Sequence, residues 1–199
     1  MLPVKDWDLN TKEIALIIMF AALTMALDPL RAPSVILLGV YFRFCEIPIV
    51  AASLLFGLRI GVPVAILNVA VEIMLFPNPA AVIGVPFVLV LTLSMLLGLH
   101  LASGFLKRRT SQTVNRGTTN AKYFLVFGAS FRTLIAPFIV GFVYRFMLPI
   151  VGIHLSDAIV VGLMPAFTLY ALIFSLYTIS IGYLIARTIS RNLKVGKQL

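Results

Sequence analysis

Polar side chains that could bind a ligand fall inside long apolar stretches of this chain, where an ionised group is costly and marks a candidate functional site. Asn68 and Glu72 are four residues apart and therefore share one face of a helix. If both stretches are helical, Glu72 lies about 16 Å and Arg132 about 13 Å from the same end of the molecule. These depths predict that Glu72 and Arg132 either form a structural ion pair or face a common binding cavity.

Arg43 and Glu46 stand where an interrupted apolar segment meets the next apolar stretch. Their spacing of three residues allows a salt bridge on one helical face. Their position also allows them to hold a polar ligand at the mouth of a pocket, and the residues leave both roles open. Arg145 falls near the end of its stretch, where we expect it to anchor the chain at a membrane surface.

A stripe of aromatic residues, Phe167, Tyr170, Phe174 and Tyr177, follows the helical spacing of three, four and three. Such a stripe is typical of core packing. Only Phe167 and Tyr170 are expected in the outer half of the membrane, where they could instead stack on a flat heterocycle. Tyr144 could form the opposite wall, so these three residues join the candidate binding set.

Recognisable catalytic and metal-binding patterns are missing from the sequence. The single cysteine, Cys45, excludes an intrachain disulfide and a cysteine-based zinc site. His100 has no second metal-type ligand at useful spacing, and there is no HExxH, GxSxG or P-loop pattern. We therefore expect no catalytic residue, no metal and no cofactor, and any ATP-driven process would require a partner protein.

The amino-acid composition indicates that these polar residues belong to a membrane protein. Apolar residues make up 61% of the 199 residues and charged residues 12%, and the mean hydropathy is +1.07. A water-soluble domain of this size could not bury so much apolar surface, so we predict a multi-pass protein of the plasma membrane. The net charge of +9 comes from basic patches between apolar stretches, which indicate membrane topology rather than nucleic-acid binding.

The apolar stretches predict a single all-α membrane domain over residues 1–199, with six transmembrane helices. The predicted spans are residues 13–28, 46–57, 61–76, 81–105, 123–148 and 158–186. Most Lys and Arg residues then fall on one side, which places both termini in the cytoplasm. Residues 28–46 are too interrupted to span and too apolar for a solvated loop, so we expect a long extracellular lid packed on the mouth of the bundle.

Together these features resemble the substrate-binding S components of energy-coupling factor (ECF) vitamin transporters. The resemblance rests on the TKEIAL segment at residues 11–16, the Ala22-x-x-x-Ala26 pattern, the long apolar first loop and the IPIVAASLLFGLRIG segment at residues 47–61. It implies a subunit that is not an enzyme and that binds a vitamin from outside under the first loop. It also implies partners, a transmembrane T component and two cytoplasmic ATPases, with Ala22 and Ala26 on the docking face.

Among S components, the chain looks most like the riboflavin-binding members. The likeness lies in residues 131–133, 147–149, 164–167 and 176–183, although the asparagine that flavin members often carry on helix five is missing between Tyr123 and Pro149. Thiamine or its pyrimidine precursor, pantothenate, biotin and a cobalamin precursor stay open as ligands. The expected binding residues are Arg43, Glu46, Asn68, Glu72, Arg132, Tyr144, Phe167 and Tyr170.

Three other classes of membrane protein remain open from the residues alone. A scaffold protein without a small ligand predicts no outward pocket and no stabilisation by vitamins. A secondary transporter could use Glu72 and Arg132 for coupling, but the sequence shows no obvious inverted repeat. A membrane-embedded enzyme would need an acid/base pair near a nucleophile, and we find none.

Overall fold

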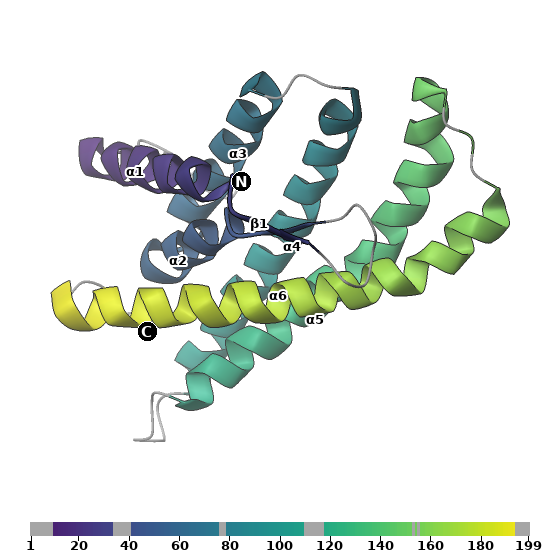
Figure 1. Ribbon diagram of the computed structural model, residues 1–199. Coiled ribbons are helices and arrows are strands. Elements are labelled where there is room, and N and C mark those ends of the chain that lie inside the picture. The colour runs from purple at the N-terminus through teal and green to yellow at the C-terminus, as the bar shows by residue number, and fades with distance from the viewer. Residues whose placement is uncertain are drawn as a thin grey trace, which may run out of the picture.

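The computed structural model describes residues 10–33, 41–75, 79–109, 118–152, 154 and 156–193. These residues form a bundle of six α-helices with a short two-stranded hairpin (Figure 1). In chain order the elements are α1 (Thr11–Leu27), β1 (Arg31–Pro33), β2 (Tyr41–Arg43), α2 (Glu46–Phe56), α3 (Leu58–Leu75), α4 (Pro79–Arg109), α5 (Thr118–Phe142) and α6 (Asp157–Leu193). A π-helical turn (Val143–Met147) and a 3-10 turn (Leu148–Val151) follow α5.

The shortest helix, α2, lies at the centre of the bundle. Its residues Glu46–Leu55 are all buried, and it packs against α1, α3, α4 and α6. Because α2 is enclosed by protein, its 11 residues need not match the thickness of a bilayer. The bundle continues outward through α4, α5 and α6, which pack in sequence order.

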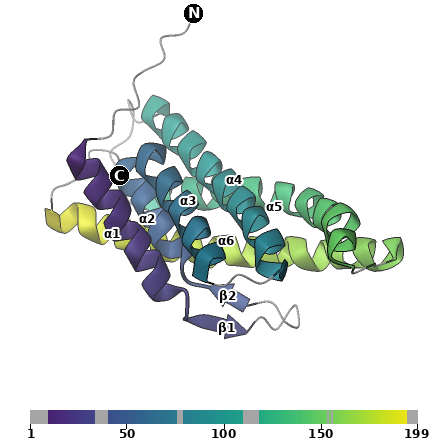
Figure 2. The ribbon, with the colours of Figure 1, turned by 90° about the horizontal axis from the view of Figure 1, so that it is seen from above.

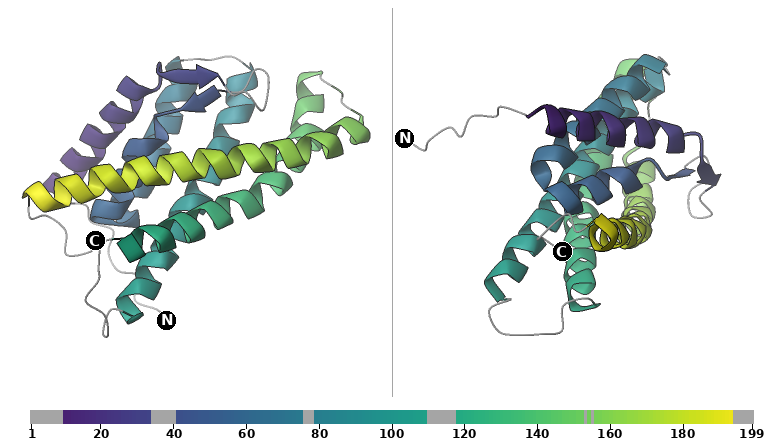
Figure 3. Two further views of the ribbon diagram at one scale, coloured as in Figure 1. Left: turned by 60° about the horizontal axis from the view of Figure 1, so that its bottom comes forward. Right: turned by 90° about the vertical axis from the view of Figure 1, so that its left-hand side faces the viewer.

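Helix α6 crosses the whole molecule. Its 37 residues correspond to about 55 Å, and it runs obliquely past α2 and α5 (Figures 1 and 3). Gly182 permits the close contact with α2, because a Cβ there would lie 2.7 Å from Val50 Cγ1. The oblique path brings residues from the middle of α6 to the hairpin end of the bundle.

The hairpin lies at the end of the bundle where α1 and α3 end and α2 begins (Figure 2). β1 pairs with β2 in antiparallel register, with Arg31 opposite Arg43 and Pro33 opposite Tyr41. The fold is therefore helical, as predicted, except for this hairpin in the segment predicted as a lid. Residues 34–40 of that segment lie outside the described residues.

Four of the helices are long and apolar enough to cross a membrane. They are α3, α4, α5 and α6, whereas α1 has 17 residues and α2 has 11. The apolar helices agree with the predicted membrane protein, while the count of six spans and their orientation stay predictions.

Two helices extend beyond the predicted spans. α3 begins at Leu58, three residues before the predicted span 61–76, because Gly57 with φ of 84° makes the turn after α2. α6 continues to Leu193, past the end of the predicted span 158–186.

Candidate functional site

Arg43 connects the hairpin to two helices. From the end of β2, its Nη2 atom lies 2.6 Å from Oδ1 of Asp28 and 2.7 Å from Oε2 of Glu72. Its Nε atom also donates to Asp28 Oδ1 at 3.2 Å. Asp28 directly follows α1 and Glu72 lies in the last turn of α3, so one guanidinium ties β2 to the ends of two helices.

A second ion pair lies deeper in the bundle. Arg132 of α5 donates from Nη2 to Oε1 of Glu46 at 3.1 Å and from Nη1 to Oε2 of the same carboxylate. Both side chains are only 3% exposed. Such bidentate, charge-assisted pairing is the strong form of hydrogen bond, and the two residues bring the N-terminus of α2 against the middle of α5.

Of the alternatives left open by the sequence, the ion pair of Glu72 with Arg132 and that of Arg43 with Glu46 do not form. Each of these four residues pairs elsewhere, as given above. Arg132 of α5 reaches the first residue of the central helix α2, whereas Glu72 of α3 lies at the hairpin beside Arg43. Two side chains at equal depth on different helices are therefore not necessarily in contact. We call Asp28, Arg43, Glu46, Glu72 and Arg132 the charged cluster.

An aromatic stack from α6 covers one side of the charged cluster. The ring of Phe174 lies 4.3 Å below the Arg132 guanidinium carbon, which adds a cation–π contact to that buried pair. Tyr170 and Tyr177 flank Phe174 with ring centroids at 5.6 Å and 5.1 Å. Phe44 continues the stack, with its ring 5.9 Å from that of Tyr177.

Tyr177 also fixes the hairpin directly. Its hydroxyl donates to the backbone carbonyl of Arg43 at 2.7 Å. We predicted that only Phe167 and Tyr170 of the stripe lie in the outer half of the membrane, and the structure places Tyr177 in contact with the hairpin as well. The prediction counted depth along an upright helix, whereas α6 runs obliquely (Figure 3).

Two further predicted residues, Asn68 and Tyr170, lie at the cluster, whereas Tyr144 follows Arg132 by twelve residues, about 18 Å along the helix. Asn68 is buried one helical turn from Glu72 on α3. Tyr144, in the π-helical turn, packs against Phe167 of α6 with ring centroids 5.8 Å apart. Tyr170 is within electrostatic reach of Glu46, Arg132 and Arg43, so it joins the two ion-paired groups at one site.

The electrostatics of the cluster keep Arg43 charged. Burial of the guanidinium by itself lowers its pKa, but the carboxylates of Glu72 and Asp28 outweigh this effect and raise the pKa above its ordinary value. The cluster thus offers guanidinium donors and carboxylate acceptors beside aromatic faces. That combination suits a polar heterocycle, which needs both stacking and hydrogen bonds.

A second feature near the site is an apolar cleft between the ends of α5 and α6. The cleft measures about 620 Å³ and includes Phe142, Val161 and Met164 in its walls, a size typical of small-molecule pockets. At its rim Arg145, the predicted surface anchor, lies 3.6 Å from Asp157, and both side chains are largely exposed.

Asp28 and Tyr177 were missed by sequence reasoning. Asp28 reads as the end of a helix before Pro29, and its only signal was a carboxylate placed directly after an apolar stretch. Within the described residues, no group of three potential metal-binding side chains is present.

Comparison with known proteins identifies the fold. No protein-family profile matches the chain, and no curated protein is significantly similar in sequence. A solved structure described as "Structure and mechanism of the S component of a bacterial ECF transporter" superposes with a TM-score of 0.67, covering 92% of this chain and 98% of the other at 21% identity. The chain has the fold of an ECF transporter S component.

The predicted docking residues lie on an exposed face of α1. Ala22 and Ala26, the predicted docking residues, are both exposed. Ile18 and Leu23 on the same helix are 60% and 47% exposed. Small side chains on an exposed helix face allow another helix to approach closely within a membrane.

Proposed function

We propose that this protein is the vitamin-binding subunit of an ECF-type importer and that its ligand binds at the charged cluster beneath the hairpin. One observation carries this proposal. In a chain with the S-component fold, five ionisable side chains and an aromatic stack converge at the hairpin end of the bundle.

Energetics support a binding role for the cluster. Buried ion pairs contribute little net stability, because desolvation offsets their attraction. Ionisable groups within apolar helices are therefore functional candidates by default. The Arg43 and Glu72 side chains keep 16% and 12% exposure, so a ligand can reach them, whereas Glu46 and Arg132 form the rigid floor.

Riboflavin is the ligand we favour. Its flat ring system suits stacking on Tyr170 or Phe167, and its polar edge suits the guanidinium donors and carboxylate acceptors of the cluster. The same chemistry would serve thiamine or its pyrimidine precursor, and pantothenate, biotin and a cobalamin precursor remain alternatives.

The remaining parts of the proposal concern topology and partners. We propose six spans in the plasma membrane with both termini in the cytoplasm, so that the hairpin faces outside. Ala22 and Ala26 would contact a transmembrane T component, and two cytoplasmic ATPases would hydrolyse ATP. This chain would bind the vitamin and perform no chemistry on it.

Identification of the co-purified ligand tests this proposal. The protein is purified in mild detergent, its visible spectrum is recorded, and the denatured extract is analysed by mass spectrometry. We expect a stoichiometric vitamin, with flavin absorbance if riboflavin is correct. A different vitamin would discard riboflavin alone. If no small molecule is found and no vitamin raises the unfolding temperature, the binding function is wrong.

A further inference from the structure

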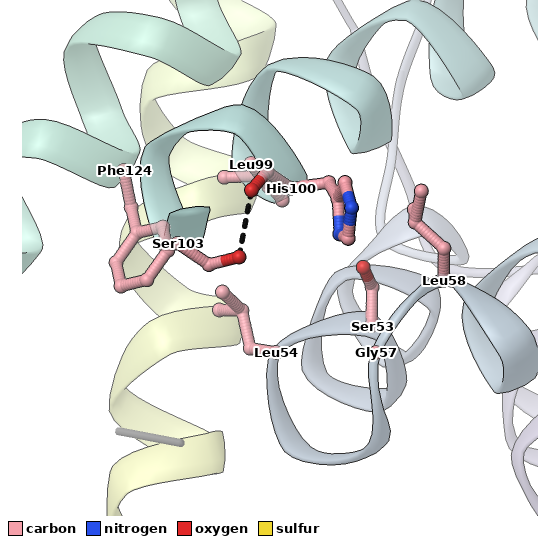
Figure 4. A pocket seen from close by; sticks show the side chains of 8 residues that line it. All are labelled: Ser53, Leu54, Gly57, Leu58, Leu99, His100, Ser103 and Phe124. Carbon is pink, nitrogen blue, oxygen red and sulfur yellow. Dashed lines mark hydrogen bonds between the residues drawn. The ribbon is translucent and has the colours of Figure 1, made fainter. Parts of the chain in front are cut away.

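A second polar cavity lies at the opposite end of the bundle from the hairpin, between α2, α4 and α5 at the start of α3 (Figure 4). It measures about 140 Å³, which is too small for a vitamin but large enough for a single oxyanion. Its walls are Leu54, Leu58, Leu99 and Phe124, and its polar lining comes from Ser53, His100 and Ser103.

The Ser53 hydroxyl is the central feature of this cavity. Ser53 is only 8% exposed, and its hydroxyl points into the cavity toward the His100 ring (Figure 4). No hydrogen bond joins it to any residue in the described part of the chain. Because this hydroxyl lines the cavity and is not used within the described part of the chain, it is free to bind a small ligand there.

The surroundings determine what kind of ligand fits. Helix α3 begins at Leu58, which lines the cavity, and the first turn of a helix carries partial positive charge. The Ser103 hydroxyl already donates to the His100 carbonyl at 2.7 Å. Side-chain donors are therefore available from Ser53 of α2 and from the His100 ring of α4, beside the positive end of α3.

The charge at this end of the bundle also favours an anion. Among the described residues here the only acid is Glu13, which lies 3.4 Å from Arg59. The basic residues at this end are Lys12, Arg59, Lys107, Arg108, Arg109, Lys122, Arg187 and Arg191. The apolar windows of α3 and α5 begin at Leu58 and Ala121, so the cavity lies near the ends of these candidate membrane spans, where headgroups are expected.

We propose that the cavity at Ser53 and His100 binds a phosphate oxyanion, supplied either by a phospholipid headgroup or by free phosphate. A phosphate oxyanion can accept hydrogen bonds from the Ser53 hydroxyl and the His100 ring, which approach from α2 and α4. This site is independent of the vitamin site, so either proposal can fail without the other.

Phosphate-dependent stability of the full chain tests this proposal. The protein is held in a maltoside detergent, which carries no phosphate, and its unfolding temperature is followed against inorganic phosphate at constant ionic strength, with chloride as reference. We expect stabilisation of the wild type by mass action. Ser53→Ala and His100→Gln should each raise the apparent Kd roughly tenfold to hundredfold, because each removes a hydrogen bond to a charged group.

Ser180→Ala is the matched control, because Ser180 does not line the cavity and its hydroxyl donates to the Leu176 carbonyl within α6, and it should respond like the wild type. A second series adds phosphatidylglycerol. If the headgroup is the source, lipid stabilises the wild type but not Ser53→Ala and abolishes the response to free phosphate. If free phosphate is the source, the lipid changes nothing.

Three results would overturn the proposal. They are a wild type that responds to phosphate no more than to chloride, equal losses in Ser53→Ala and Ser180→Ala, and tighter binding of acetate than of phosphate. The last result would assign the cavity to a carboxylate, such as that of a partner protein.

Discussion

Replacing Arg132 by methionine leaves the Glu46 carboxylate buried without its partner. Both side chains are 3% exposed and share two hydrogen bonds. Breaking such a pair from one side costs about 3–5 kcal/mol, while replacing both partners by apolar residues is often close to neutral. We therefore expect Arg132→Met and Glu46→Met each to lower the free energy of unfolding strongly. The double variant should lose far less stability than the two single losses added together.

A double-mutant cycle on ligand-free protein measures this difference. Unfolding is followed in mixed micelles with increasing denaturing detergent. We expect a coupling energy of about 3 kcal/mol between positions 46 and 132. The matched cycle uses Glu72→Met with Arg132→Met, which should be additive within about 0.5 kcal/mol, because Glu72 pairs with Arg43. Additivity between positions 46 and 132, or strong coupling between 72 and 132, would refute the assigned pairing.

Three further predictions concern packing, docking and the hairpin. Gly98→Ala should lower the free energy of unfolding by about 1–3 kcal/mol, since its Cβ would lie 2.6 Å from the Phe127 carbonyl oxygen. Ala22→Leu should abolish co-purification with a T component while vitamin binding persists, because bulk on α1 blocks close helix approach. Cys45 is 2% exposed beside the hairpin, so Arg43→Ala, which removes ties from β2 to α1 and α3, should speed its maleimide labelling about tenfold or more. Burial raises the Cys45 pKa to about 12, so at pH 7 the folded wild type should be labelled far more slowly than unfolded protein, in which an exposed thiol has a pKa of about 8.5.

Each of these predictions has a control within the chain. Gly104→Ala should be neutral or stabilising by up to about 1 kcal/mol, as its Cβ meets nothing within 4 Å. Ala158→Leu, at an exposed position of α6, should leave assembly intact. Asp157→Asn, in an exposed pair with Arg145, should not change Cys45 labelling. A control that behaves like its test variant would contradict the corresponding reasoning.

Local patterns determined what could be predicted about the fold. Long apolar runs are helical because a helix satisfies its own backbone hydrogen bonds in an apolar setting, and the structure is helical as expected. The ends of the helices were less predictable. The last predicted span ends at residue 186, where basic residues begin, but Lys and Arg are good helix formers, and α6 continues to Leu193.

The ion-pair partners within the site could be identified only from the three-dimensional arrangement of the helices. Glu72, Arg132, Arg43 and Glu46 were all recognised from their cost in apolar surroundings, but their pairing depends on which helices are neighbours. Hydrophobicity does not encode that order, and the oblique path of α6 that brings Tyr177 to Arg43 arises from packing at sites such as Gly182. Asp28 was overlooked because a carboxylate next to proline also suits an ordinary helix end.

An equilibrium titration of the purified chain with vitamins tests the central claim most directly. Riboflavin binding is followed by quenching of flavin fluorescence, and other vitamins by calorimetry, for the wild type, Arg132→Gln and Phe138→Ala, whose side chain is 79% exposed. The account predicts that one vitamin binds the wild type and Phe138→Ala with equal affinity, and that Arg132→Gln weakens binding at least about tenfold. Equal binding by all three proteins, or no binding of any vitamin to the wild type, would contradict a vitamin site at the charged cluster.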